Sequence, residues 1–131
     1  MKSIKQYKEV FILGIGGSGM SSIAKYLSQR GAIVKGYDQR SSYITNLLEN
    51  DGVKTTQEMD NECYNKDILY VISSAFKIEN TFLNNYQSQE NVMTRPIFLH
   101  LLSKEVEIIG ITGSHGKTST TALISHIFHY N

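Results

Sequence analysis

Six residues near the start of the chain, Gly14–Gly19, have the composition and position of a turn that binds a diphosphate. The glycines fit the pattern G-x-G-x-x-G, directly after the apolar run 10–13 and directly before a helical pattern that begins at Ser18. Glycines remove the side chains that would keep a pyrophosphate away from backbone N–H groups, and the N-terminus of a helix favours negative charge. The candidate binding residues of this turn are Gly16, Gly17, Ser18 and Gly19.

Asp38 closes the second apolar run, at the distance from the turn at which dinucleotide-binding folds carry a ribose-binding acid. Its carboxylate is therefore a candidate acceptor for a ribose hydroxyl. A purely structural interpretation is that the glycines permit a tight strand-to-helix turn and that Asp38 is a turn residue. The strand before the turn and the helix after it favour the binding interpretation. The pattern does not choose between NAD, FAD and a UDP-sugar, because each contains a pyrophosphate.

A second loop, Thr112–Thr118, has the features of a loop that binds the phosphates of ATP. It follows the apolar run 106–111, precedes a helical pattern and ends in Gly-Lys-Thr. Backbone N–H groups of such a loop surround phosphates, the Lys117 ammonium neutralises charge on the β and γ oxygens, and the Thr118 hydroxyl can bind Mg²⁺. The candidate cofactor-binding residues are Gly113, Ser114, His115, Gly116, Lys117, Thr118 and Ser119, with Lys117 and Thr118 as candidate catalytic residues and Thr118 as candidate metal ligand.

This loop departs from the common ATP-binding pattern, because Ile111 stands where that pattern has its first glycine. A structural interpretation is a glycine-rich connection with an exposed lysine. A strand, two glycines, Lys-Thr and a helix in this order favour phosphate binding instead. For His115, base catalysis is less favoured than orienting the loop or contacting the substrate.

The elements that would position both motifs alternate between short apolar runs and helical patterns. This predicts an α/β fold: a Rossmann-like parallel sheet with helices on both faces, followed by the first strand, phosphate loop and helix of a truncated ATPase domain. The expected strands are Val10–Leu13, Ala32–Val34, Ile68–Ile72, Asn91–Met93 and Val106–Ile111. The expected helices are Ser18–Gln29, Tyr43–Asn50, Thr81–Gln87, Pro96–Ser103 and Lys117–His129. The predicted domains are 1–103 and the start of a second at 104–131.

Composition and charge exclude several classes of protein. With 131 residues, 40% hydrophobic residues and a formal net charge of +1, the chain has about the length of one globular domain and no basic block for coating nucleic acid. Its longest uncharged stretch is interrupted by glycines, so no membrane span is expected. Cys63 is the only cysteine, which excludes an internal disulfide. Since the N-terminus lacks a signal-peptide pattern, we expect a cytoplasmic protein that binds neither membrane nor nucleic acid.

The loop Thr112–Thr118 resembles the variant phosphate loop of the Mur ligases, ATP-dependent enzymes that add amino acids to the peptidoglycan precursor. Histidine before Gly-Lys-Thr is the form found in the alanine-adding branch of this family, and residues 14–24 are similar to the first loop and helix of that branch. Val71–Lys77 resembles the family's strand with a Ser-Ser-Ala turn, and Arg95 falls where the family has an arginine before a helix.

The resemblance implies that the complete enzyme uses ATP and Mg²⁺ to join L-alanine to UDP-N-acetylmuramate through an acyl phosphate. This chain would be its N-terminal part, which binds the UDP-sugar but is inactive alone. Residues 16–19 would hold the pyrophosphate and Asp38 the ribose or a nearby hydroxyl, with Ser73 and Ser74 among the substrate contacts. The apolar side chains of the last helix would cause weak self-association.

Two alternatives from other functional classes stay open. The chain could be a dinucleotide-binding module of an oxidoreductase, although a dehydrogenase needs no second phosphate loop around Lys117. It could also be a non-catalytic UDP-sugar sensor, which would bind its ligand tightly without further domains.

Overall fold

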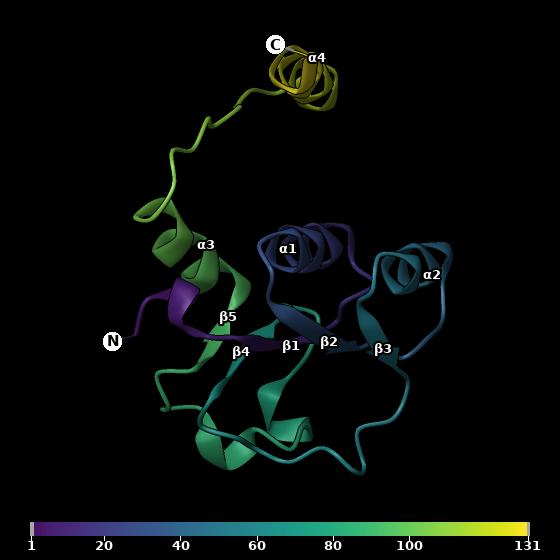
Figure 1. The fold of residues 1–131 in the computed structure, drawn as a ribbon, viewed down its shortest axis with the longest axis vertical. Helices are drawn as coiled ribbons and strands as arrows, with labels where there is room; N and C mark the ends of the chain where they lie inside the picture. The colour runs from purple at the N-terminus through teal and green to yellow at the C-terminus, as the bar shows by residue number, and fades with distance from the viewer. Residues whose placement is uncertain (1, 131) are drawn as a thin grey trace.

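The computed structural model describes residues 2–130, and its centre is a five-stranded parallel β-sheet (Figure 1). The strands follow the order β3-β2-β1-β4-β5 across the sheet. They are β1 (Glu9–Leu13), β2 (Ile33–Tyr37), β3 (Lys54–Thr56), β4 (Ile68–Ile72) and β5 (Val92–Thr94). Every pairing between these strands is parallel. The expected α/β fold with a parallel sheet is confirmed.

β1 lies in the middle of the sheet, and the order of the strands reverses around it. The chain runs from β1 through β2 to β3 on one side and then continues with β4 and β5 on the other. Leu13, the last residue of β1, stands opposite Tyr37 on one side and Ile72 on the other. In open α/β sheets, ligands bind outside the carboxyl ends of the strands at such a switch point. The glycine-rich turn begins there.

Side chains of β1 alternate between the two faces of the sheet, and each face has its own core. Val10 and Ile12 belong to the face on which α1 (Ser18–Gln29), α2 (Tyr43–Asn50) and α3 (Arg95–Ser103) pack (Figure 1). The buried apolar side chains that these helices contribute are Met20, Ile23, Ala24, Leu27, Leu48 and Phe98. Burial of this apolar area fixes the helices above the strands.

Helices were expected on both faces of the sheet, but the opposite face is covered by short 3-10 turns and loops (Figure 1). Phe11, Leu13, Tyr70 and Leu83 are buried in its core. The Tyr70 hydroxyl accepts a hydrogen bond from the Asn65 amide at 2.9 Å, and burial raises the pKa of this phenol to about 12. The phenol is therefore protonated at neutral pH and ties the loop before β4 to the sheet.

The helix expected at 81–87 is a wrong prediction. This region has two short 3-10 turns instead, Ile78–Asn80 and Asn84–Tyr86. The Thr81 hydroxyl donates to the carbonyl of Ile78 at 2.7 Å and accepts from a backbone amide two residues later at 3.1 Å. Such local bonds compete with helical hydrogen bonds, and the two asparagines that follow have low helix propensity.

Two strand assignments also differ from the sequence prediction. β3 was missed because Lys54–Thr56 is a short polar segment at the edge of the sheet, where it pairs with β2. The strand expected at Val106–Ile111 does not form. A parallel strand requires a neighbouring strand for its hydrogen bonds. Residues 106–111 have an apolar pattern but lie beside no strand of the sheet.

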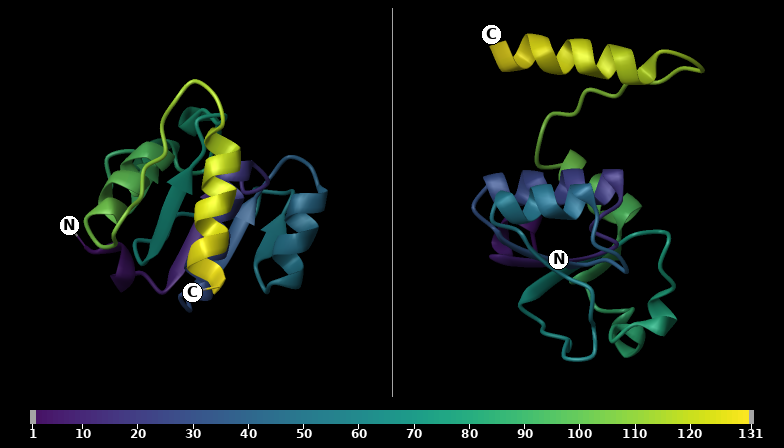
Figure 2. Two further views of the ribbon diagram at one scale, coloured as in Figure 1. Left: turned by 90° about the horizontal axis from the view of Figure 1, so that it is seen from above. Right: turned by 90° about the vertical axis from the view of Figure 1, so that its right-hand side faces the viewer.

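Helix α4 (Lys117–Tyr130) forms as predicted and stands apart from the sheet (Figure 2). Residues 104–116 connect it to the end of α3. Apolar side chains of α4 are exposed, including Leu123 and Phe128. Within residues 2–130, no helix combines the length and the hydropathy needed to span a bilayer.

β2 passes very close to the turn that follows β1. A Cβ atom added to Gly36 would lie 2.4 Å from Ile15 Cδ1 and 2.8 Å from the Ile12 carbonyl oxygen. Ile15 is fully buried, and the carbonyl belongs to a central strand, so neither atom can move far. Glycine at position 36 therefore allows the turn to pack against β2.

We predict that Gly36→Ala lowers the free energy of unfolding by about 1–3 kcal/mol, because the added methyl group overpacks this contact. Urea denaturation measures the effect. Gly110→Ala is the matched control, since a Cβ atom there would meet nothing within 4 Å. Equal stability of the two variants would contradict the packing argument.

Candidate functional site

The glycine-rich turn after β1 meets residues that follow three other strands. Asp38 follows β2, Ser73 follows β4 and Arg95 follows β5. A Cβ atom added to Gly14 would lie 2.7 Å from Ser73 Cβ, and one added to Gly16 would lie 2.7 Å from Asp38 Oδ2. The parallel sheet thus gathers residues that are distant in sequence around the turn.

The N–H groups of the turn itself are engaged by the protein. Gly14 and the residue after it donate to the Tyr37 carbonyl at 2.8 and 3.0 Å, and Gly17 donates to the carbonyl of Gly14 at 3.1 Å. Gly16 donates to the carboxylate of Asp38 at 2.8 Å. The shape of the turn is therefore set by its own hydrogen bonds.

The donors suited to an anion come one step later, in the first turn of α1. The first N–H groups of a helix have no partner within the helix, and Gly17 caps α1 without a side-chain hydrogen bond. Ser18 and Gly19 supply the first two of these N–H groups. The positive end of the helix dipole lies at the same place.

The Arg95 guanidinium lies over this turn of α1. A Cβ atom added to Gly19 would lie 2.5 Å from Arg95 Cζ and 2.6 Å from Arg95 Nη2. Glycine at position 19 therefore leaves room for the guanidinium. Arg95 is exposed, and no carboxylate of residues 2–130 forms an ion pair with it. A cation beside the positive end of a helix is stabilised when an anion binds between them.

A cavity of about 230 Å³ opens at the switch point between β1 and β4. Its lining consists of Gly14, Gly17, Asp38, Gln39, Ser73, Ala75 and Phe76. The Ser73 hydroxyl accepts from the Ala75 amide at 3.2 Å and so shapes the turn after β4. Ser74 is exposed and, with Ser73, lines a neighbouring and more apolar cavity of about 410 Å³.

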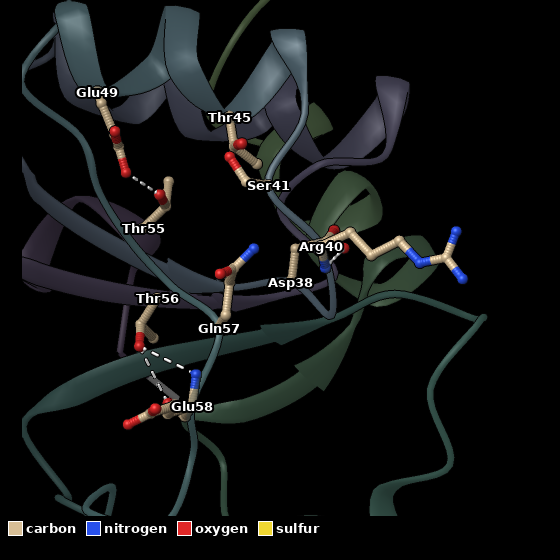
Figure 3. Close-up of a pocket in the computed structure, with 9 residues that line it drawn as sticks. All are labelled: Asp38, Arg40, Ser41, Thr45, Glu49, Thr55, Thr56, Gln57 and Glu58. Carbon is tan, nitrogen blue, oxygen red and sulfur yellow. Dashed lines mark hydrogen bonds between the residues drawn. The ribbon is translucent and has the colours of Figure 1, made fainter.

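A polar cavity of about 310 Å³ adjoins the first one at Asp38 (Figure 3). Its lining comes from the segment after β2, from α2 and from the region of β3 and comprises Asp38, Arg40, Ser41, Thr45, Glu49, Thr55, Thr56, Gln57 and Glu58. Gln57 points into the cavity, whereas the Arg40 side chain extends away from it (Figure 3). Asp38 lines both cavities.

The loop Thr112–Thr118 lies away from this edge of the sheet, beside α4 (Figure 2). Gly113 and Gly116 have φ angles of +143° and +76°, which favour glycine. A Cβ atom at Gly116 would meet nothing within 4 Å, and the residues of the loop are exposed. An open backbone followed by Lys117 at a helix N-terminus fits a polyphosphate.

The structure places the two predicted groups of residues on separate segments. Residues 16–19, Asp38 and Ser73 lie around one edge of the sheet, with Ser74 at its margin. Lys117 and Thr118 do not join them. Sequence reasoning left Arg95 out of the site, although its position directly after a short strand and before Pro96 places it at the same edge.

The strand order and the glycine-rich turn at its switch point are typical of nucleotide-binding α/β folds, and a second glycine-rich loop follows on a separate segment. The profile of the Mur ligase family, catalytic domain, matches residues 9–107, and the chain belongs to this family. The family resemblance read from the two loops is thereby confirmed.

Curated relatives match almost the whole chain. The UDP-N-acetylmuramate–L-alanine ligase of Cytophaga hutchinsonii is 36% identical over 127 residues, which are 92% of this chain and 27% of that protein. The enzyme of the same name from Prochlorococcus marinus is 36% identical over 130 residues, or 93% of this chain and 28% of that protein. This chain spans less than a third of the length of either relative.

Two solved structures share the fold. The UDP-N-acetylmuramate-alanine ligase of Thermotoga maritima matches with a TM-score of 0.76 and 24% identity, over 92% of this chain and 29% of that one. A murein peptide ligase of Psychrobacter arcticus matches with a TM-score of 0.69 and 28% identity, over 94% of this chain and 26% of that one.

We predict that Gly19→Ala leaves the fold intact while moving the Arg95 guanidinium. The added methyl group meets the end of a flexible side chain, and alanine favours the helix by up to about 1 kcal/mol over glycine. Urea denaturation should show unchanged or slightly raised stability, and the Arg95 Nε–H signal should shift in NMR spectra. A loss of more than about 2 kcal/mol, the size expected of core overpacking, would contradict this geometry.

Proposed function

We propose that the carboxyl edge of the sheet binds UDP-N-acetylmuramate through its diphosphate. The N–H groups of Ser18 and Gly19 and the guanidinium of Arg95 would hold the phosphate oxygens. The observation that carries this proposal is the guanidinium lying within contact distance of Gly19 at the start of α1. A planar guanidinium and helix N–H groups are well suited to bind phosphate together.

The two cavities that meet at Asp38 support an arrangement for the rest of this ligand. The nucleoside would occupy the polar cavity beyond Asp38, where hydroxyl, carboxylate and Gln57 amide groups offer hydrogen-bond partners. The sugar would lie on the other side of the turn, next to Ser73 and Ser74. A diphosphate that joins two polar groups suits an edge with a cavity on each side of the turn.

The loop 112–118 is proposed as the site of Mg-ATP. Its backbone and the side chains of Ser114, His115 and Ser119 would surround the phosphates, the Lys117 ammonium would neutralise their charge and the Thr118 hydroxyl would bind Mg²⁺. Bound Mg-ATP supplies the phosphoryl group that activates a carboxylate for attack by an amine. This chain's residues would position and neutralise the phosphates.

We infer that the protein takes part in joining L-alanine to UDP-N-acetylmuramate in the cytoplasm. The names of the relatives from Cytophaga and Prochlorococcus support this activity, as does the His-Gly-Lys-Thr loop. Residues 1–103 would bind the UDP-sugar, and residues 104–131 would begin the ATP-binding part. On its own the chain is expected to bind the UDP-sugar without turnover.

Calorimetric titration with UDP-N-acetylmuramate, with NADH and Mg-ATP in parallel, tests the proposed UDP-sugar site. We predict saturable binding of the UDP-sugar that Arg95→Ala weakens at least about tenfold, because a charged hydrogen bond to phosphate is lost. Arg95→Lys should recover only part of the affinity, since an ammonium cannot form a forked contact.

Arg30→Ala is the matched control, because Arg30 is an exposed arginine at the opposite end of α1. Binding of NADH in place of the UDP-sugar would favour the oxidoreductase alternative. Equal affinity of the Arg95→Ala and Arg30→Ala variants would contradict the assignment of Arg95.

A further inference from the structure

The carboxylate of Asp38 is turned toward the protein's own glycine-rich turn. Its Oδ2 atom accepts a hydrogen bond from the Gly16 amide at 2.8 Å. A Cβ atom at Gly16 would lie 2.7 Å from the same oxygen and 3.4 Å from Thr45 Cγ2. Glycine at position 16 therefore brings the backbone within hydrogen-bond distance of the carboxylate.

This contact belongs to a set through which the end of β2 holds the turn. The Tyr37 carbonyl accepts from two successive amides, those of Gly14 and Ile15, at 2.8 and 3.0 Å. Asp38 accepts from the next amide along the chain. Three consecutive N–H groups of the turn are thus bound by two consecutive residues of the segment that ends β2. Asp38 is the member of this set that acts through its side chain, so it can be changed without altering the backbone.

We propose that Asp38 is a positioning residue for the diphosphate site. By holding Gly16, its carboxylate fixes the direction in which the chain enters α1, and thereby the N–H groups of Ser18 and Gly19. The ligand that these groups serve is taken from the proposed function, whereas the action of Asp38 on the turn does not depend on it.

The other oxygen of the carboxylate gives Asp38 a second role at the same time. Oδ1 accepts a hydrogen bond from the Arg40 amide at 3.4 Å, and Asp38 lines both cavities. Because a carboxylate oxygen can accept a second hydrogen bond, Oδ1 can also bind a hydroxyl of the nucleoside. One carboxylate then orders the phosphate-binding turn with one oxygen and meets the ligand with the other.

The experiment compares Asp38→Ala with Asp38→Asn in the 131-residue chain. Asn keeps an oxygen that can accept from the Gly16 amide, whereas Ala removes it. Amide hydrogen exchange and the NMR shift of Gly16 report on the turn without any ligand, and calorimetry with UDP as the probe reports on the anion site. Asp60→Ala is the control, because Asp60 is an exposed acid outside both cavities.

In Asp38→Ala we expect Gly16 exchange to accelerate about tenfold or more, the change that corresponds to losing a hydrogen bond to a charged group. Exchange in β1 should remain unchanged, which separates a local effect from general unfolding. UDP affinity should fall about tenfold in Asp38→Ala and largely recover in Asp38→Asn.

Unchanged Gly16 exchange in Asp38→Ala would overturn the proposal. Faster exchange with unchanged UDP affinity would overturn it as well, since the turn would then be ordered without consequence for the ligand. If the unaltered chain fails to bind UDP, the proposed function fails, and the exchange data alone decide whether Asp38 holds the turn.

Discussion

The structure depends on the parallel pairing of β1 with a strand on each side. Because β2 and β4 both run alongside β1, their carboxyl ends meet at the glycine-rich turn. The chain after β2 can then hold this turn through Tyr37 and Asp38, and the chain after β4 can close it through Ser73. Glycines at 14, 16 and 36 are required by the close approach of these segments. The need for glycine is thus partly structural, and the same packing shapes the candidate site.

This packing explains why the N–H groups of the glycine-rich segment have two different roles. The amides of the turn are used to shape it, while the first N–H groups of α1 are left for a ligand. Arg95, which follows the edge strand β5, adds a positive charge at the start of α1. The ATP-type loop around Lys117 lies on a separate segment. The Mur ligase family match covers residues 9–107 and therefore the turn, whereas the loop 112–118 follows the matched segment.

Much of this arrangement could be predicted from the sequence. The strands 68–72 and 10–13 and the helix 18–29 carry strong apolar patterns, and each was found close to its expected position. β3 and the 81–87 region were not predictable in the same way, because a polar edge strand has no apolar signal and the Thr81 hydroxyl redirects the local backbone. The strand expected at 106–111 does not form, although its apolar pattern is strong. A strand needs a neighbouring strand for its hydrogen bonds, and a local sequence pattern does not show whether one is present.

The site could be predicted in its residue types but not in its contacts. Spacing identified the glycines and Asp38, with Asp38 as a ribose-binding or turn residue. Its contact with Gly16 was not predictable, because the distance between the two residues depends on how tightly β2 packs on the turn. Arg95 was left out of the predicted site because Gly19 and Arg95 are far apart in the sequence. Their contact forms only when the strands between them are arranged in the sheet.

We propose that the carboxyl edge of the sheet, at the start of α1, holds the diphosphate of a UDP-sugar. A crystal structure of the chain with UDP-N-acetylmuramate tests this most directly. We expect phosphate oxygens within about 3.2 Å of the Ser18 and Gly19 amide nitrogens and of the Arg95 guanidinium. A diphosphate bound in the loop 112–118, with the edge of the sheet empty, would contradict it.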